Sequence, residues 1–297
     1  MGDDDTGIEG VRRLLASRPR PTTLAERRER LDEIGSADGV AADIRFDAAQ
    51  IGGVAAEWSL TPGAEVSRLL MFLHGGGYSS GSIASHRGLV AEAGRAAGVR
   101  TLAVGYRLAP ENPFPAALED ARAAYDALLA QGVDAAHVAI GGDSAGGGLT
   151  LALLAGLRAA GRPLPACAWL LSPWVDLAMT GATLATKAAV DPIISPPYLH
   201  ELAAAYLAGA DPADPRASPL HADLTGLPPL LIQVGSAETL LDDAARIAER
   251  AGAADVAVTL EVWPHMIHAW PLWAARLPAG RAALASAGAF IRARLGG

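Results

Sequence analysis

From about residue 68 onward, short apolar runs alternate with longer segments in which apolar residues recur at helical spacing. Some runs, such as residues 69–73 and 166–171, are continuously apolar, which is typical of strands buried on both faces of a parallel sheet. This alternation predicts an α/β fold whose mostly parallel sheet is flanked by helices. We expect strands at 69–73, 100–104, 138–141, 166–171, 230–234 and 256–263, and helices at 85–97, 115–130, 145–160, 240–251 and 279–295.

The first part of the chain follows another order, with two helices and then two strands joined by a glycine turn. With these two strands, the predicted sheet has eight. We interpret residues 1–40 as an N-terminal helical cap segment and residues 41–297 as one main domain. The predicted helices are 10–17 and 23–34, and the predicted strands are 42–46 and 54–60.

One connection between predicted strands is much longer than the others. A stretch of about 60 residues between the strands at 166–171 and 230–234 is too long for a plain connector, and such loops are usually functional. It is rich in Pro, Ala and Asp. We expect a cap insertion at about 180–220, with a helix near 197–207 that covers the active site.

Charge and composition exclude several classes of protein. The net charge of −8 argues against a nucleic-acid-binding face and against adhesion to an anionic membrane. The acidic start resembles no signal peptide and no run is apolar enough to span a bilayer, so we expect a cytoplasmic protein. Cys167 is the only cysteine and is expected to be buried in a strand.

The strongest chemical signal is the segment Gly142-Asp143-Ser144-Ala145-Gly146, which lies between a predicted strand and a predicted helix. G-x-S-x-G in this context is the nucleophile elbow, a sharp turn that exposes a serine. Small neighbours are required because strand and helix approach closely there. The serine at the helix N-terminus benefits from the helix dipole. Ser144 is therefore the predicted nucleophile.

A second signal, His74-Gly75-Gly76-Gly77, follows the strand at 69–73. Acyl transfer passes through an oxyanion that needs preorganised N–H donors, and a glycine run exposes its amides. Ala145, directly after the serine, is expected to supply another donor. A phosphate-binding loop is disfavoured because no lysine follows the glycines. His74 is expected to be a structural hydrogen-bonding residue.

The general base and the acid that would activate Ser144 are expected in the loops that follow the last two predicted strands. His268 is the predicted base, because its loop extends beyond the final strand, while His265 is expected to be a loop residue. Glu238 is the predicted acid, since it comes soonest after the strand at 230–234. Asp242 and Asp243 fall in the following helix and are expected to face solvent. The chain order of serine, acid and histidine is that of α/β hydrolases.

The sequence resembles the bacterial hormone-sensitive-lipase-like esterases. Besides the elbow and the glycine run, residues 106–116 (YRLAPENPFPA), 172–177 (SPWVDL) and 214–220 (DPRASPL) carry the likeness. The resemblance implies an α/β-hydrolase fold and an N-terminal cap. It also implies an edge-strand homodimer and an oxyanion hole formed by Gly76, Gly77 and Ala145. The family acid is commonly aspartate, whereas this chain has Glu238. We also expect Tyr78 to contact substrate.

These observations predict a carboxylic ester hydrolase that acts on short-chain acyl esters or lactones through a Ser-His-Glu triad and an acyl-enzyme. Within the family, the sequence looks most like the monoterpene epsilon-lactone hydrolases and related small-ester hydrolases. A deacetylase of an acetylated small metabolite is one alternative. A ligand-binding protein without catalysis is the alternative from another class. We expect neither a metal nor a cofactor.

Overall fold

The computed structural model describes residues 7–296 and contains one sheet with the strand order β1-β2-β4-β3-β5-β6-β7-β8. β1 pairs with β2 and β2 with β4 in antiparallel fashion, while every later pairing is parallel. The predicted mostly parallel, eight-stranded sheet is therefore confirmed. The strands are β1 Arg45–Ile51, β2 Val54–Leu60, β3 Glu65–Leu73, β4 Val99–Gly105, β5 Val138–Asp143, β6 Cys167–Leu171, β7 Leu230–Gly235 and β8 Val258–Trp263.

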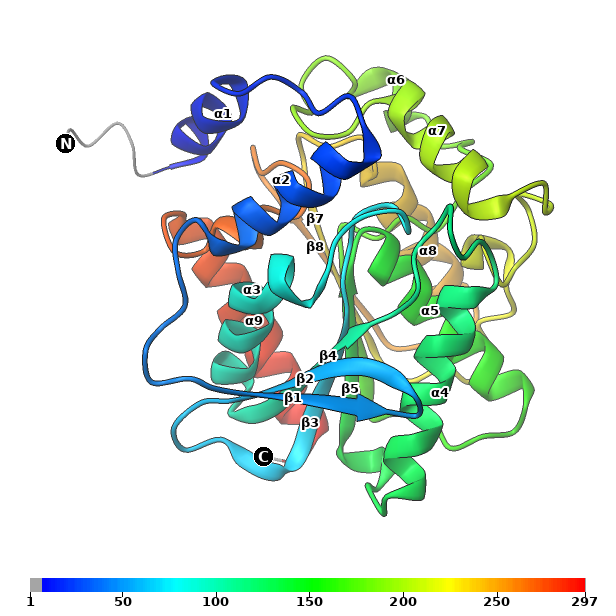
Figure 1. Ribbon diagram of the computed structural model, residues 1–297. Coiled ribbons are helices and arrows are strands. Elements are labelled where there is room, and N and C mark those ends of the chain that lie inside the picture. The colour runs from blue at the N-terminus through cyan, green and yellow to red at the C-terminus, as the bar shows by residue number, and fades with distance from the viewer. Residues whose placement is uncertain (1–6, 297) are drawn as a thin grey trace.

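Helices cover both faces of this sheet (Figure 1). α3 (Ile83–Ala97) and α9 (Pro278–Arg294) pack together on one face. α4 (Ala116–Ala130), α5 (Ala145–Ala159) and α8 (Leu241–Ala253) lie on the other. This two-sided cover explains why the central strands read as continuous apolar runs, because neither face of the sheet meets water.

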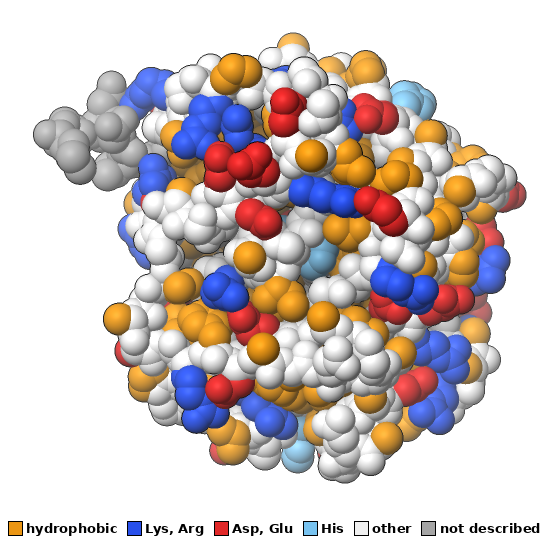
Figure 2. Space-filling view, in the orientation of Figure 1, with side chains coloured by type: hydrophobic (Ala, Val, Ile, Leu, Met, Phe, Trp, Pro, Cys, Tyr) orange, Lys and Arg blue, Asp and Glu red, His pale blue; other side chains and the backbone are white. Residues whose placement is uncertain are grey.

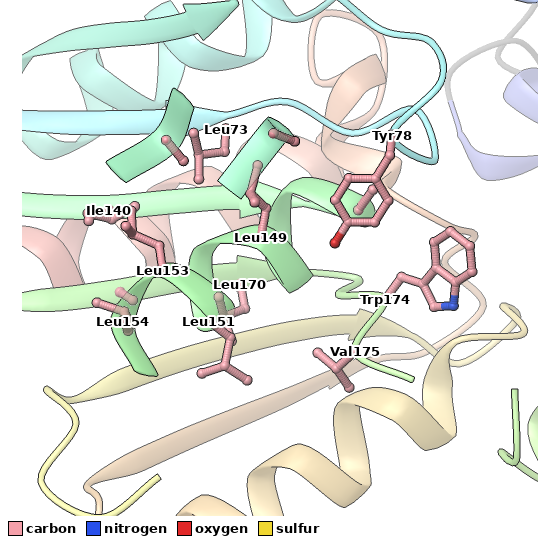
Figure 3. Packing of buried hydrophobic residues seen from close by; sticks show 14 of the residues in the cluster. Leu73, Tyr78, Ile140, Leu149, Leu151, Leu153, Leu154, Leu170, Trp174 and Val175 are labelled. Carbon is pink, nitrogen blue, oxygen red and sulfur yellow. The ribbon is translucent and has the colours of Figure 1, made fainter. Parts of the chain in front are cut away.

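The central strand β3 contributes side chains to the hydrophobic clusters on both faces of the sheet. Leu69, Met71 and Leu73 pack with one hydrophobic cluster, whereas Leu70 and Phe72 pack with the cluster on the opposite face. This alternation is the two-residue period of a strand. In the first cluster, Leu73 and its neighbours from β5 and α5 extend toward two aromatic side chains, Tyr78 and Trp174 (Figure 3).

Four helices lie beyond the carboxyl ends of the parallel strands and form a cap (Figure 1). They are α1 (Ile8–Ala16), α2 (Leu24–Ser36), α6 (Thr183–Thr186) and α7 (Pro196–Leu207). Arg27 of α2 forms two hydrogen bonds with Glu201 of α7, at 2.6 and 2.9 Å. Arg28 pairs with Glu111 and donates to the carbonyl of Ser79 in the glycine-rich loop. Basic and acidic side chains lie next to one another over this part of the surface (Figure 2).

Two features of the fold depart from the sequence prediction. The first strand was expected at 42–46 but runs from Arg45 to Ile51, because its hairpin with β2 pairs Ile51 with Val54 across the glycine turn. Most of β1 is exposed or half-buried and contains two alanines, so it lacks the apolar signal used to find strands. The short helix α6 was not predicted. The helix expected near 197–207 is confirmed as α7.

β8 is the edge strand of the sheet, and on one of its faces Leu260 (38%) and Val262 (46%) are exposed. The homodimer implied by the family resemblance would use this edge, and it stays a prediction. Among residues 7–296, no helix combines the length and the apolar character needed to cross a membrane.

Two glycines of α5 make a matched test of the strand-to-helix packing. A Cβ on Gly146 would overlap the carbonyl oxygen of Leu73, whereas a Cβ on Gly156 would meet nothing within 4 Å. We expect Gly146→Ala to lower the free energy of unfolding by about 3 kcal/mol or more. Gly156→Ala should raise it by about 0.5–1 kcal/mol, because alanine loses less backbone entropy in a helix. Urea unfolding of both variants measures this, and equal effects would contradict the packing described.

Candidate active site

Ser144 occupies a strained turn between β5 and α5. Its backbone has φ 54° and ψ −121°, a conformation that L-residues rarely adopt. The turn is held by the Ser144 amide, which donates to Leu171 O at 2.9 Å, and by the Ser144 carbonyl, which accepts from the Trp174 amide at 2.9 Å. The flanking glycines are required, because a Cβ on Gly142 would overlap the carbonyl of Gly146. Surrounding structure therefore fixes the predicted elbow on both sides.

His268 and Glu238 are brought together as the sequence predicted. His268 Nδ1 lies 3.3 Å from Glu238 Oε1, and both side chains are buried. The other carboxylate oxygen, Oε2, accepts from Ser172 Oγ at 2.8 Å and from the Gly235 amide at 2.9 Å. Ser172 Oγ also accepts from the Ala269 amide at 3.1 Å. Ser172 thus connects the loop of the acid to the loop of the histidine.

The four polar residues of this region follow four neighbouring strands. Ser144 follows β5, Ser172 follows β6, Glu238 follows the end of β7, and His268 lies in the loop after β8. The carboxyl ends of parallel strands meet at one edge of the sheet, which is where α/β proteins place their ligands. The fold therefore gathers on one edge residues that are far apart in the sequence.

The electrostatic environment favours the protonated form of His268. Burial by itself would lower the pKa of this imidazole, because it disfavours the charged form. The hydrogen bond and charge of Glu238 outweigh burial, aided by the charges of Asp191 and Asp143, and raise the pKa of His268 above its ordinary value of 6.5. A cation formed on this ring is thus stabilised by buried carboxylates.

Three backbone amides near the serine have no acceptor among the described residues. They belong to Gly76, Gly77 and Ala145, the residues expected to form an oxyanion hole. Gly76 (φ 115°) and Gly77 (φ 62°) adopt conformations that favour glycine. Buried amides are nearly always paired, so these donors are suited to an oxygen supplied by a ligand.

Asp143, the residue before the serine, anchors the glycine loop. Its Oδ1 accepts from the Gly75 amide at 2.8 Å, and Oδ2 lies 3.2 Å from His86 Nε2. Burial would raise the pKa of Asp143, but the charges of His86, His268 and His74 lower it below its ordinary value. Sequence reasoning missed this contact, although the aspartate stood inside the motif, because nothing in the sequence indicated which helix would supply His86.

Three further residues singled out in the sequence, His265, Tyr78 and Cys167, lie in different surroundings. His265 is exposed in a loop, with its amide donating to Ser236 Oγ at 2.8 Å. Tyr78 is buried and stacks on Tyr206, with ring centroids 3.8 Å apart. Its predicted contact with substrate stays a prediction. Cys167 is buried in β6, where burial raises the pKa of its thiol to about 12. No group of three or more His, Cys, Asp or Glu side chains within residues 7–296 could hold a metal ion.

The expectation that Asp243 faces solvent is wrong. Its side chain is buried and accepts hydrogen bonds from the amides of Val175 and Asp176, at 3.0 and 3.1 Å. Arg246, one turn later, lies 3.2 Å away. Burial raises the pKa of Asp243 to about 7. The first turn of α8 packs against the loop after β6, which helical spacing alone does not indicate. Asp242 is half-buried and accepts from the Ala182 amide at 2.8 Å.

The fold and this edge of the sheet define an α/β hydrolase. A family model described as the alpha/beta hydrolase fold matches residues 70–272. An acetyl-hydrolase of Streptomyces hygroscopicus is 50% identical over 250 residues, which cover 84% of this chain and 83% of that protein. A putative acetyl-hydrolase of Mycobacterium tuberculosis is 37% identical over 289 residues, covering 97% and 92% of the two chains.

A solved structure of an esterase from the bacterial hormone-sensitive lipase family matches with a TM-score of 0.93 and 47% identity, covering 96% of each chain. The chain therefore belongs to the α/β-hydrolase family and, within it, to the bacterial hormone-sensitive-lipase-like esterases. It is an ester hydrolase.

His74 yields a prediction for stability. Burial, followed by the charge of His86, lowers the pKa of His74 from 6.5 to about 4. Between these values the unfolded chain binds more protons than the folded protein, so stability falls as the pH is lowered. From pH 7 to pH 5 we expect this group to cost about 2 kcal/mol. Urea unfolding at both pH values should show a smaller loss for His74→Asn. An equal loss in the variant would contradict the assignment.

Proposed function

We propose that this enzyme hydrolyses short-chain carboxylic esters, with Ser144 as nucleophile, His268 as general base and Glu238 as the orienting acid. The observation that supports this most directly is the buried Glu238–His268 pair at 3.3 Å, on the same sheet edge as the strained Ser144. Gly76, Gly77 and Ala145 serve as the oxyanion hole. Their amides lack acceptors within the described residues. Ala145 directly follows the serine, and the hydrogen bond between Asp143 and Gly75 holds the loop of Gly76 and Gly77 close to it.

The reaction follows from these positions. His268 takes the proton of Ser144 Oγ as that oxygen attacks the ester carbonyl, and the carbonyl oxygen becomes an oxyanion bound by the three amides. The tetrahedral intermediate collapses to an acyl-enzyme. His268 gives its proton to the departing alkoxide, which leaves as the alcohol. A water molecule, deprotonated by His268, then attacks the acyl carbonyl, and the acid leaves when Ser144 Oγ regains the proton.

Glu238 contributes by holding the ring and by stabilising its cation. A hydrogen bond from Nδ1–H to the carboxylate leaves Nε2 unprotonated, so that this atom can take the proton of Ser144. Because His268 must be neutral to accept a proton, activity falls as the pH drops through its pKa. That pKa is raised above 6.5, so the decline begins at a higher pH than an unperturbed histidine would give.

A confined site supports small acyl groups. Ser144 is 7% and His268 is 5% exposed. The Leu202 side chain of α7 packs directly on Gly77, where a Cβ would overlap it. The relative from S. hygroscopicus is named an acetyl-hydrolase, which supports an acetyl group as the acyl part here. These observations support short-chain esters and small lactones as substrates, and deacetylation of an acetylated small metabolite is the second candidate.

The catalytic assignment is tested by three variants. We expect Ser144→Ala to lower kcat on p-nitrophenyl acetate by about 10⁴- to 10⁶-fold, as in other serine hydrolases. His268→Asn should cause a comparable loss, while His265→Asn should stay within about 2-fold of the unmodified enzyme. Equal losses for the two histidine variants would refute the choice of base. An inactive unmodified enzyme would favour the non-catalytic alternative.

The substrate class is tested by matched compounds. We expect kcat/KM to be highest for acetyl and butyryl esters of p-nitrophenol and to fall at least about 10-fold for longer acyl chains, because extra methylenes meet the packed cap. A small lactone panel and an acetyl amide of p-nitroaniline complete the set. Faster cleavage of the acetyl amide than of the acetyl ester would reverse the order of the two candidates.

A further inference from the structure

Asp191 is a buried carboxylate of the cap to which the proposed chemistry assigns no task. It lies between α6 and α7, and it is only 4% exposed. Its Oδ1 accepts from the amides of Ile193 and Ile194, each at 2.9 Å. These two bonds shape the turn that leads into α7. They use one carboxylate oxygen and leave the other to contact a different part of the fold.

The second oxygen reaches the loop that carries the acid. Oδ2 accepts from the amide of Thr239 at 2.8 Å and from its hydroxyl at 3.1 Å. Thr239 is fully buried and directly follows Glu238. The Thr239 carbonyl accepts from the hydroxyl of Thr183 in α6 at 2.7 Å. The cap insertion therefore holds the residue after the acid at its N–H, its hydroxyl and its C=O.

Glu238 is thus fixed from two directions. From the sheet side, Ser172 and the Gly235 amide hold its carboxylate. From the cap side, Asp191 holds the backbone of Thr239. The position of the carboxylate relative to the ring of His268 depends on both supports, because neither one alone restrains both the backbone and the side chain of the acid.

The charge of Asp191 also acts on the histidine. The charged groups that face His268 are Glu238 after β7, Asp191 in the cap and Asp143 in the elbow. Burial lowers the pKa of His268, and these three carboxylates together raise it. Asp191 thereby stabilises the imidazolium that forms when Ser144 loses its proton.

We propose that Asp191 is a positioning residue for the Glu238–His268 pair, through which the cap insertion completes the acid side of the active site. This inference rests on the proposed triad. A seated cap aligns the acid by means of Thr239, so the cap contributes to the rate of the chemical step as well as to the shape of the pocket.

The test compares Asp191→Asn with Asp242→Asn. Both residues accept an amide of the cap segment, but Asp242 binds Ala182 and does not contact Thr239. We expect Asp191→Asn to lower kcat about 10- to 100-fold through misplacement of the pair. KM should change by less than about 2-fold, because ground-state binding is retained. The acid limb of the kcat/KM profile should move to lower pH, since a carboxylate that raises the histidine pKa is lost. Asp242→Asn should leave kcat and the acid limb unchanged.

Glu238→Gln separates failure of this inference from failure of the triad. If Asp191 acts chiefly through the acid, adding Asp191→Asn to Glu238→Gln should lower kcat much less than it does in the unmodified enzyme, because only the charge of Asp191 on His268 is then lost. Unchanged kcat and pH profile in Glu238→Gln would overturn the triad itself. If Glu238→Gln loses activity while Asp191→Asn has the same kcat and the same acid limb as Asp242→Asn, only the role of Asp191 is overturned.

A purely structural role is also distinguishable. It would lower Tm and the active fraction of Asp191→Asn without moving the acid limb, and that result would overturn the proposal. Should Asp191→Asn fail to fold, Thr239→Val removes only the hydroxyl bond to Asp191. We then expect a smaller loss of kcat, about 3-fold, in the same direction. An unmoved kcat and acid limb in Thr239→Val would contradict the proposal.

Discussion

Parallel pairing of β5, β6, β7 and β8 in chain order brings four side chains to one edge of the sheet. They are Ser144, Ser172, Glu238 and His268, one after each strand. Neighbouring strands lie about 4.8 Å apart, so side chains that leave successive strand ends are within reach of one another without long loops. The hydrogen bond between Glu238 and His268 is the direct product of that spacing. The elbow, the glycine loop and the cap all act at this edge.

Burial gives these contacts their strength. Water would screen the charges of Glu238, Asp143 and Asp191, whereas in the interior they raise the pKa of His268 despite its own desolvation. Burial and the charge of His86 lower the pKa of His74 to about 4, and no carboxylate hydrogen-bonds to that ring to offset them. Two buried histidines in one protein thus differ in proton affinity, chiefly because His268 has a hydrogen-bonded carboxylate partner whereas His74 lies near the charge of His86.

Much of the fold and of the candidate active site could be predicted from the sequence. The elbow and the glycine loop carry their own local causes, since only small residues permit the turn at Ser144 and only glycines expose the amides of Gly76 and Gly77. Chain order and strand ends sufficed to predict that Glu238 and His268 lie close together. Asp191 and the contact of Asp143 with His86 could not be predicted, because each depends on which distant element folds against it. Asp243 was misread for the same reason.

Covalent labelling tests the convergence of the triad most directly. The unmodified enzyme is treated with a fluorophosphonate, and the modified peptide is mapped by mass spectrometry over a range of pH. We expect one adduct, on Ser144, whose rate of formation falls as the pH drops through the raised pKa of His268 and which His268→Asn abolishes. An adduct at another residue, or labelling of Ser144 that is independent of His268, would contradict the claim that the imidazole activates the serine.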